Sequence, residues 1–520
     1  MGRVPAGTRP MFSTYVLFFF APNAIMMDSD AAGTAQDNGR DSMPKQSSRM
    51  QSLHVLIALA AGLLLLFFLP TGEHLTPVGV RVIALMLPML YLWLTTNTHW
   101  TCLLALALLV TTGAMSANEV WAGSLGSFVV MTVIAYMLLN VCLKETGVID
   151  RIALWFITRR FVRGRPYLFL AMFFLSNLLI GMFMENLTLA IIYIGITEGI
   201  ARHLKLEKGE PLYTVLFTGV MWGNVLVACC SPVAHVLPNV LIALLETQAG
   251  LRVSYAAWFA YGSVFAAMMF CVMMLVIRLW NPDTSAFRHY DPEELRASAA
   301  PLGKAGVIAS LTFLAVILLS LLPSSLGAYP IFAAVNRWGN AVPALFAICL
   351  LALIHVDERP VLDVPAAMRQ LPLPSVIFAG TVSVFAVPLS SEATGITPWL
   401  GSLLVPALGG RPVWLTLVVL LALAILMTNF LSNMVTQILF FNIGLILLRG
   451  SYSMAAFCIL IGVASGIAVA TPSANIPSPL FFGPGHISMR STWKANLAFA
   501  LAGLLLSVVP GISLAAALAG

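Results

Sequence analysis

Charged residues are scarce in this chain. Asp, Glu, Lys and Arg make up only 9% of its 520 residues, and 60% are hydrophobic, whereas soluble domains carry roughly 25% charged residues. This composition excludes a soluble globular protein, because no single core could bury so much apolar surface. It predicts an all-α polytopic membrane protein in the lipid bilayer. The net charge of +6 does not indicate a nucleic-acid partner, because Lys and Arg are enriched in the cytoplasmic loops of membrane proteins.

The motifs of several enzyme classes are missing. The sequence contains no HExxH metal-binding motif and no GxxxxGK[ST] phosphate loop. Its cysteines lie in apolar segments without CxxC spacing, so we read them as small buried hydrophobes, although Cys229 and Cys230 could line a site. We therefore expect neither an enzyme nor a cofactor beyond a coupling ion. The seven cysteines are Cys102, Cys142, Cys229, Cys230, Cys271, Cys349 and Cys458.

Two apolar stretches carry polar residues at their centres. Phe173–Gly195 contains Glu185-Asn186-Leu187-Thr188, and Leu417–Ile443 contains Ser432-Asn433-Met434-Val435-Thr436. Carboxylates and carboxamides are costly at membrane depth and mark functional sites by default. We predict that residues 166–202 and 412–448 form hairpins with these polar residues at their tips.

Two further apolar segments are interrupted by proline. Residues 212–245 are broken around Ser231-Pro232, with His235 inside the break, and residues 455–482 are broken around Thr471-Pro472, with Asn475 inside it. Tips and breaks follow in the same order in both halves of the chain. Such an order predicts an internal structural repeat.

The distribution of Lys and Arg predicts the orientation of the chain. If both hairpins are re-entrant, most basic residues fall on one side, which is then cytoplasmic. Treating the hairpins as pairs of full crossings gives the same bias, so that alternative stays open. The two repeats then have opposite orientations in the membrane. We expect the protein to lie in the cell membrane with its N-terminus in the cytoplasm. The predicted parts are a disordered cytoplasmic tail 1–50, a first repeat 51–280 with a cytoplasm-entering hairpin 166–202, a cytoplasmic linker 281–302, and a second repeat 303–520 with an outside-entering hairpin 412–448.

An inverted repeat would bring both tips and both breaks to the middle of the membrane. The N-terminal ends of the half-helices carry free N–H groups and partial positive charge, which suit an anion. Unwound carbonyls and the oxygens of Ser, Asn and Thr suit a hard cation such as sodium. The sequence therefore predicts neighbouring anion and cation sites, as coupled transport requires.

The chain resembles the divalent anion:sodium symporter family, which carries dicarboxylates, citrate and sulfate, within the ion transporter superfamily. Trp100–Leu106, Asn186, Ser432-Asn433, Val469–Pro472 with Asn475, and Gly485–Met489 carry the resemblance. It implies about eleven transmembrane helices plus two re-entrant hairpins, an elevator-type motion and a homodimer. It also implies a sodium site at Asn186, Ser432 and Asn433. The anion-binding residues that it implies are Asn186, Thr188, Asn433, Thr436, Ser231, Pro232, Thr471 and Pro472.

The tips depart from the family pattern. Glu185 stands in place of a serine, and Leu187 and Met434 replace threonines. The leading prediction is a secondary transporter of a small anion, a carboxylate or a sulfate-like ion, coupled to sodium or protons. The alternative is a cation/proton antiporter that uses Glu185, since a buried carboxyl can exchange a proton for a cation. Glu185 could also be an inert turn residue, and His235 a structural one. The predicted ion-coupling residues are Glu185, Asn186, Ser432, Asn433, His235 and Asn475.

Overall fold

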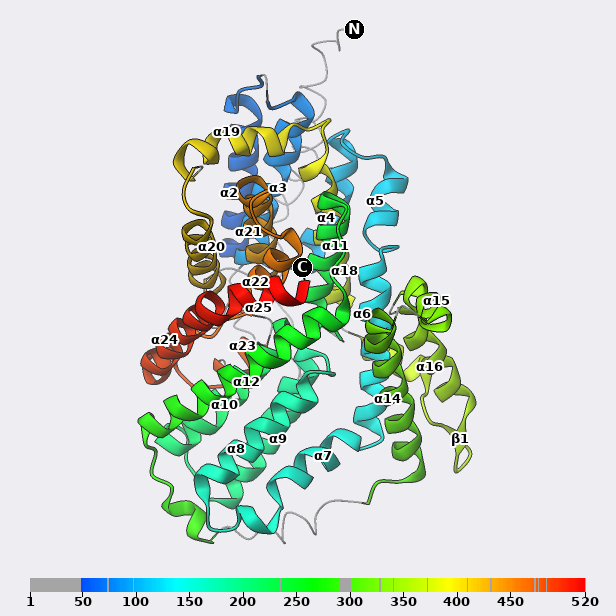
Figure 1. The fold of residues 1–520 in the computed structure, drawn as a ribbon, viewed down its shortest axis with the longest axis vertical. Coiled ribbons are helices and arrows are strands. Elements are labelled where there is room, and N and C mark those ends of the chain that lie inside the picture. Colours follow the sequence, from blue (N-terminus) through cyan, green and yellow to red (C-terminus); the bar gives the residue numbers. More distant parts are fainter. Residues whose placement is uncertain are drawn as a thin grey trace, which may run out of the picture. The chain divides into compact units, whose positions relative to one another are not determined.

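The structure is a computed structural model that describes residues 48–519, with short gaps at 73, 97, 234, 290–300, 327–328, 340, 372, 409, 431–432, 472–473, 476 and 483. Within these residues the chain is helical apart from one pair of two-residue strands (Figure 1). The predicted all-α class is therefore confirmed. The predicted tail 1–50 falls almost entirely outside the described residues, as does part of the predicted linker 281–302.

The described residues form two compact units. Unit one contains the chain through Gly126 and Gly380–Leu403, and unit two contains Ser127–Ala379 and Leu404–Gly520. The helices of unit one are α2 (Ser48–Phe68), α3 (Pro77–Thr95), α4 (Thr98–Thr111) and α5 (Ala117–Gly123). The helices that continue from one unit into the other are α18 (Leu373–Ser390) and α19 (Ile396–Leu408).

Unit two holds the remaining elements, and all described residues of the predicted site lie in it. Its elements between Ser127 and Ala379 are α6 (Phe128–Glu145), α7 (Val148–Ile157), η2 (Arg160–Val162), α8 (Pro166–Gly181), α9 (Asn186–His203), α10 (Pro211–Cys230), α11 (Val236–Ala249), α12 (Tyr255–Trp280), η3 (Ser285–His289), α14 (Lys304–Ser325), α15 (Pro330–Trp338), α16 (Ala341–Leu353), β1 (His355–Val356), β2 (Arg359–Pro360) and α17 (Val364–Arg369). Its later elements are α20 (Val413–Thr428), α21 (Asn433–Leu448), α22 (Met454–Ser465), α23 (Ser478–Phe482), α24 (Met489–Leu506), η4 (Ser507–Gly511) and α25 (Ile512–Ala519).

Several helices are long and apolar enough to cross a bilayer. Among the described residues they are Met50–Phe68, Pro211–Cys230, Tyr255–Trp280, Lys304–Pro323 and Met489–Ala519. Further apolar helices of 10–17 residues include both helices of the second predicted hairpin. These helices support a multi-pass membrane protein. The count of eleven spans, the inverted repeat and the elevator motion stay predictions.

Unit one is held together where α3 begins. Thr76 donates a hydrogen bond from Oγ1 to the Ala393 carbonyl at 2.7 Å and caps α3 by accepting from the Gly79 N–H. A Cβ on Gly79 would lie 2.0 Å from the Thr394 carbonyl oxygen, so only glycine permits this approach. The core around this contact consists of Leu75, Val80, Val82, Ile83, Leu389 and Ile396.

Helix α10 is the centre of unit two. Residues 212–230 are all buried, and α8, α9 and α12 pack around the helix (Figure 1). Small residues allow the close contacts: the Phe174 ring lies against Gly219, and Gly262 of α12 lies against the Cys230 carbonyl. A buried helix surrounded on all sides can fix the position of the segment that leaves its C-terminal end. The segment that leaves the end of α10 is the first predicted break.

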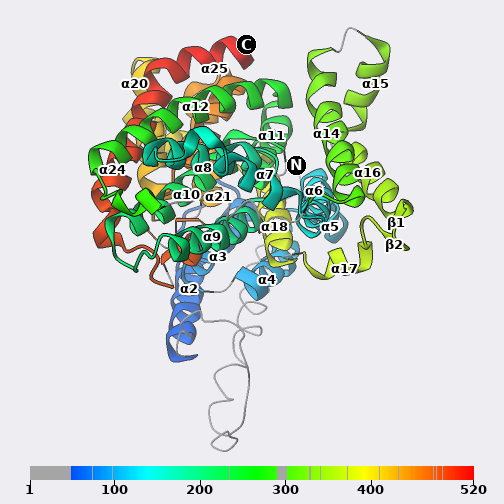
Figure 2. The same ribbon diagram turned by 90° about the horizontal axis from the view of Figure 1, so that it is seen from below.

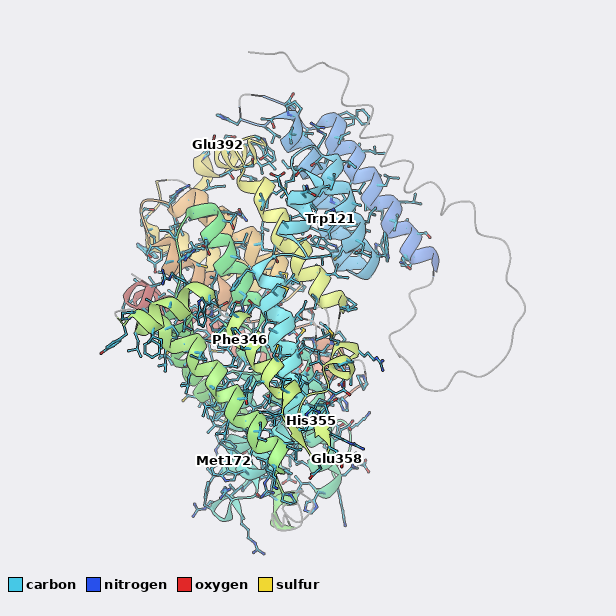
Figure 3. All side chains as sticks on the ribbon, turned by 90° about the vertical axis from the view of Figure 1, so that its right-hand side faces the viewer. Trp121, Met172, Phe346, His355, Glu358 and Glu392 are labelled. Carbon is cyan, nitrogen blue, oxygen red and sulfur yellow. The ribbon has the colours of Figure 1, made fainter. Side chains whose placement is uncertain are left out.

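A second group of helices in unit two is formed by α14, α15 and α16 (Figure 2). Tyr136 of α6 joins it through a 2.6 Å hydrogen bond to Ser320 of α14. Helix α16 leads into the antiparallel hairpin of β1 and β2, on which His355 and Glu358 lie (Figure 3). Asp357 and Glu358 both have positive φ, the backbone of the tight hairpin turns that match strand twist.

The two predicted breaks differ in extent. The first lies where the sequence places it, because α10 ends at Cys230 and α11 begins at Val236. The second begins earlier than expected, because α22 ends at Ser465 rather than near Thr471. No proline lies between 465 and 471, so the early end requires another cause, which the contacts of Asn429 supply below.

Candidate transport site

Helices α8 and α9 are separated by the short turn 182–185 at the first predicted tip. Glu185 is the N-cap of α9. Its Oε1 accepts from the Leu187 N–H at 3.0 Å. Its Oε2 accepts from the Thr188 N–H at 2.9 Å and from the Thr188 hydroxyl at 3.1 Å. The carboxylate thus accepts hydrogen bonds from backbone N–H groups that have no partner within the helix, because they lie in its first turn.

Asn186 and Thr188, the predicted ligands at this tip, have different surroundings. The Thr188 hydroxyl is engaged by Glu185. The Asn186 carbonyl accepts from Nδ2 of Asn224 on α10 at 2.9 Å, which ties the tip to the central helix. The buried Oδ1 of Asn186 has no hydrogen-bond partner among the described residues. A buried oxygen without a donor is suited to a cation.

The first break is bonded directly to the first tip. Ser231 donates from Oγ to the Met182 carbonyl, and His235 donates from Nε2 to the Gly181 carbonyl at 2.8 Å. Both carbonyls belong to the C-terminal end of α8, where the regular helical hydrogen bonds stop, and the Gly181 carbonyl also accepts from the Met184 N–H at 3.3 Å. Asn239 shapes the break itself, since its Nδ2 donates to the carbonyls of Pro232 and His235. The predicted residues Ser231, Pro232 and His235 therefore lie beside the first tip.

The His235 contact permits a test between a structural role and proton relay. We expect His235→Ala to weaken transport by about twofold to tenfold, because the bond that ties the first break to the Gly181 carbonyl is lost, at a cost of about 0.5–1.5 kcal/mol, while the Met184 N–H still bonds that carbonyl. His235→Gln should retain most activity, because a carboxamide N–H can replace the imidazole N–H. Initial uptake rates at equal protein density measure both. Equal loss in the two variants would contradict the structural role.

The second hairpin consists of α20 and α21. Asn433 is the first residue of α21, and its Oδ1 lies 3.2 Å from the Thr428 hydroxyl. Thr436 and Gln437 are fully buried on the first turn of α21. Thr436 Oγ1 and Gln437 Oε1 lack hydrogen-bond partners among the described residues. Ser432 lies outside the described residues, so the structure does not address its predicted role.

Asn429, the residue after α20, holds the second break. Its Oδ1 accepts from the N–H groups of Val469 and Ala470 at 2.9 and 2.8 Å, and its Nδ2 donates to the Ile467 carbonyl at 2.9 Å. The Asn429 carbonyl accepts from the Thr471 hydroxyl. These bonds replace the helical hydrogen bonds that residues 467–470 would otherwise make, which explains why α22 ends early.

Asn475 stabilises the end of the same segment. Its Nδ2 donates to the Ala468 carbonyl at 2.8 Å, and its Oδ1 accepts from the Ser478 N–H at the start of α23. Thr471 and Asn475 therefore both serve the backbone of the break. Pro472 lies outside the described residues.

The two halves of the site meet within unit two. Gln437 of α21 donates from Nε2 to the Leu237 carbonyl in the first turn of α11 at 3.1 Å. The second break packs on the end of α10, since a Cβ on Gly466 would lie 2.2 Å from the Cβ of Cys229. Tip one contacts break one, break one continues into α11, and α11 contacts the helix that begins at tip two. These contacts form one connected polar network.

Three carboxamides that link separate segments of this network were not among the predicted site residues. They are Asn224, Asn429 and Gln437, each buried and each bonded to a backbone carbonyl of another segment. A carboxamide in an apolar helix indicates either a functional site or a side chain that pairs backbone groups lacking helical hydrogen bonds. Applied to every Asn and Gln in the apolar stretches, this rule would have found all three.

The C-terminal part of α9 is anchored by His486, in the segment between α23 and α24 and outside the candidate spans. Its Nδ1 is hydrogen-bonded to the Tyr213 hydroxyl at 2.8 Å, and its ring stacks on Phe217. Its Nε2 lies 3.6 Å from a carboxylate oxygen of Glu198 on α9. Burial lowers the pKa of His486, Glu198 raises it, and Lys208 lowers it, with a net decrease.

This decrease predicts a pH dependence of stability. The unfolded chain takes up the proton near pH 6.5, before the folded protein does. The contribution of His486 is therefore complete above the unfolded-state pKa and is lost as the pH falls below it. We expect acidification from about pH 7.5 to about 5.5 to lower the melting temperature more in the wild type than in His486→Gln. Parallel pH profiles of the two proteins would contradict this assignment.

Comparisons with known proteins identify the family. The model of the citrate transporter family matches residues 89–448. The L-tartrate/succinate antiporters of Escherichia coli (strain K12), Shigella boydii serotype 4 (strain Sb227) and Shigella flexneri are each 26% identical to this chain over 140 residues. That segment covers 26% of this chain and 29% of each relative. The family match spans more than half of the chain and includes both hairpins and the first break. The chain belongs to the citrate transporter family.

Proposed function

We propose that this protein is a secondary active transporter of a small carboxylate anion, coupled to sodium ions or protons. The observation that carries the proposal is the contact between the first turns of α11 and α21, made by Gln437 and the Leu237 carbonyl. Two half-helix starts meet there within one apolar unit. Both ends present partial positive charge to the same region.

The donors at this meeting point suit a carboxylate. Helix α11 starts after His235 without a side-chain cap, and its third residue, Pro238, has no N–H. The N–H groups of Val236 and Leu237 are therefore the donors that this helix end offers to an anion. Thr436 and Asn433 add a hydroxyl and a carboxamide from the facing helix. The name of the family refers to citrate, and the names of the relatives refer to tartrate and succinate, all of which are carboxylates. A carboxylate is therefore our proposed substrate class.

Oxygen atoms in the same network suit the coupling ion. Asn186 Oδ1, Thr436 Oγ1 and Gln437 Oε1 are buried and lack hydrogen-bond partners among the described residues. Sodium prefers neutral and anionic oxygen ligands of this kind. We propose that Asn186 contributes to one cation site and that Ser432 and Asn433 contribute to another. Antiport of two carboxylates, as named for the relatives, would use the same anion site.

Uptake of labelled succinate, citrate and tartrate into proteoliposomes tests the proposal. A sodium gradient, a pH gradient, both or neither is imposed across the membrane. We expect saturable uptake of at least one carboxylate that depends on one of the gradients. Protein-free liposomes control for leakage. Carboxylate flux equal to that control under every condition would refute the proposal.

A cation/proton antiporter is the second candidate, and Glu185 is the observation that favours it. Its carboxylate lies at the first tip, and its partners are neutral donors of its own hairpin. Such a group can bind a proton or a cation in turn. Addition of sodium to proteoliposomes containing a pH-sensitive dye would then release protons, and Glu185→Gln would abolish the release. The carboxylate transporter predicts no sodium-driven proton release without a carboxylate.

A further inference from the structure

The N-terminal end of α9 differs from that of α11 because the side chain of Glu185 already occupies it. Three donors of α9 bind the Glu185 carboxylate within 3.1 Å, namely the N–H groups of Leu187 and Thr188 and the Thr188 hydroxyl. These are the groups through which an exposed helix start binds a carboxylate from outside. The first tip is thus satisfied by the protein itself.

We propose that Glu185 is a specificity-determining residue, whose side chain fills the anion-binding end of α9 and, when ionised, adds a negative charge at the tip that is bonded to the first break. The inference rests on the proposed function. Glu185 follows Met182 by three residues, and Met182 is bonded to Ser231 in the first break. The break leads directly into α11, whose open first turn belongs to the proposed anion site. The tip that carries Glu185 is therefore linked to the proposed anion site through this bond and the residues of the first break.

The tip cannot easily rearrange to expose its donors. The Gly181 carbonyl is held by His235, the Met182 carbonyl by Ser231, and the Asn186 carbonyl by Asn224. These bonds fix the turn on both sides of Glu185. The carboxylate side chain is the part of the tip that can be exchanged by mutation with the least change to the backbone.

The consequence concerns the charge of the preferred substrate. An ionised Glu185 repels each additional negative charge on the ligand, whereas a neutral cap would leave the partial positive charge of the α9 end available to the ligand. The wild-type protein should therefore discriminate against the more highly charged of two anions of equal shape. Removal of the charge with retention of the cap should relax this discrimination.

Succinate and its monoamide, succinamate, are a suitable pair, because they have nearly the same shape and differ by one charge. Dissociation constants for both are obtained from the thermal stabilisation of the purified full-length protein in detergent. Glu185→Ser keeps a favourable N-cap without charge. Glu185→Asp keeps both the cap and the charge and is the matched control. We expect Glu185→Ser to improve binding of succinate relative to succinamate by roughly twofold to thirtyfold, and Glu185→Asp to leave the ratio near the wild-type value.

The outcomes separate this inference from the proposed function. An unchanged succinate-to-succinamate ratio in Glu185→Ser, with both ligands still bound, would overturn the inference alone. Failure of succinate, succinamate, citrate and tartrate to stabilise the wild type or either variant would overturn the proposed function, and the inference with it. Melting of the ligand-free variants shows whether each protein is folded.

Discussion

Replacement of Asn429 by alanine is expected to reduce carboxylate uptake by about tenfold or more and to lower the melting temperature. The carboxamide of Asn429 pairs the N–H groups of Val469 and Ala470 and the carbonyl of Ile467. Each buried backbone group left without a partner costs about 1–3 kcal/mol. The second break would therefore lose its fixed geometry. Uptake into proteoliposomes and thermal melting in detergent measure the two effects.

Asn442→Ala is the matched control for Asn429→Ala. Asn442 lies on α21 of the same hairpin, and its Nδ2 bonds the Ile438 carbonyl one turn back in its own helix. Loss of this local bond leaves the helical backbone intact, so we expect less than about a twofold change in uptake. Equal activity of Asn429→Ala and Asn442→Ala would show that the second break does not depend on Asn429.

Gly262→Ala is expected to lower the melting temperature by about 1–3 °C and to impair transport. A Cβ at this position would lie 1.8 Å from the Cys230 carbonyl oxygen, so α12 would have to move away from the end of α10. Overpacking of a buried contact costs about 1–3 kcal/mol, and more where backbone must shift. The same movement would break the bond from Trp258 to the Cys229 carbonyl and displace the first break.

Gly195→Ala is the control for this prediction. Gly195 lies within α9, and a Cβ there would meet nothing within 4 Å. Alanine also favours helix over glycine by about 1 kcal/mol, so Gly195→Ala should be neutral or slightly stabilising. A Gly262→Ala protein with wild-type melting and uptake would contradict the close approach of α12 to α10.

Features that depend on local chemistry could be predicted from the sequence. Scarce charge predicts a membrane protein, and the structure is helical with several apolar helices long enough to span a bilayer. Proline and serine at 231–232 located the first break, because proline cannot continue a helix hydrogen-bond pattern. Capping by Glu185 also involves only the next three residues. Capping rules could have identified it, but they favour Ser, Asp and Asn over Glu.

Features that depend on distant partners could not be predicted in this way. Helix α22 ends at Ser465 because the side chain of Asn429, about 40 residues earlier, accepts hydrogen bonds from the N–H groups of Val469 and Ala470. Gln437 contacts Leu237 across 200 residues of sequence. Neither pairing leaves a periodic or compositional trace in one sequence. The polar residues at 429 and 437 show only that some partner must exist for each buried carboxamide.

Counterflow tests the central claim, that this protein is a carboxylate carrier, whichever ion is coupled to transport. Proteoliposomes are loaded with unlabelled succinate and diluted into the same buffer containing a trace of labelled succinate, with no gradient of sodium or protons. Citrate and tartrate are tested in the same way. A carrier predicts transient accumulation of label inside the vesicles above the external concentration, which Asn429→Ala reduces and Asn442→Ala does not. Absence of accumulation for all three carboxylates, with the protein shown to be folded and inserted, would contradict the central claim.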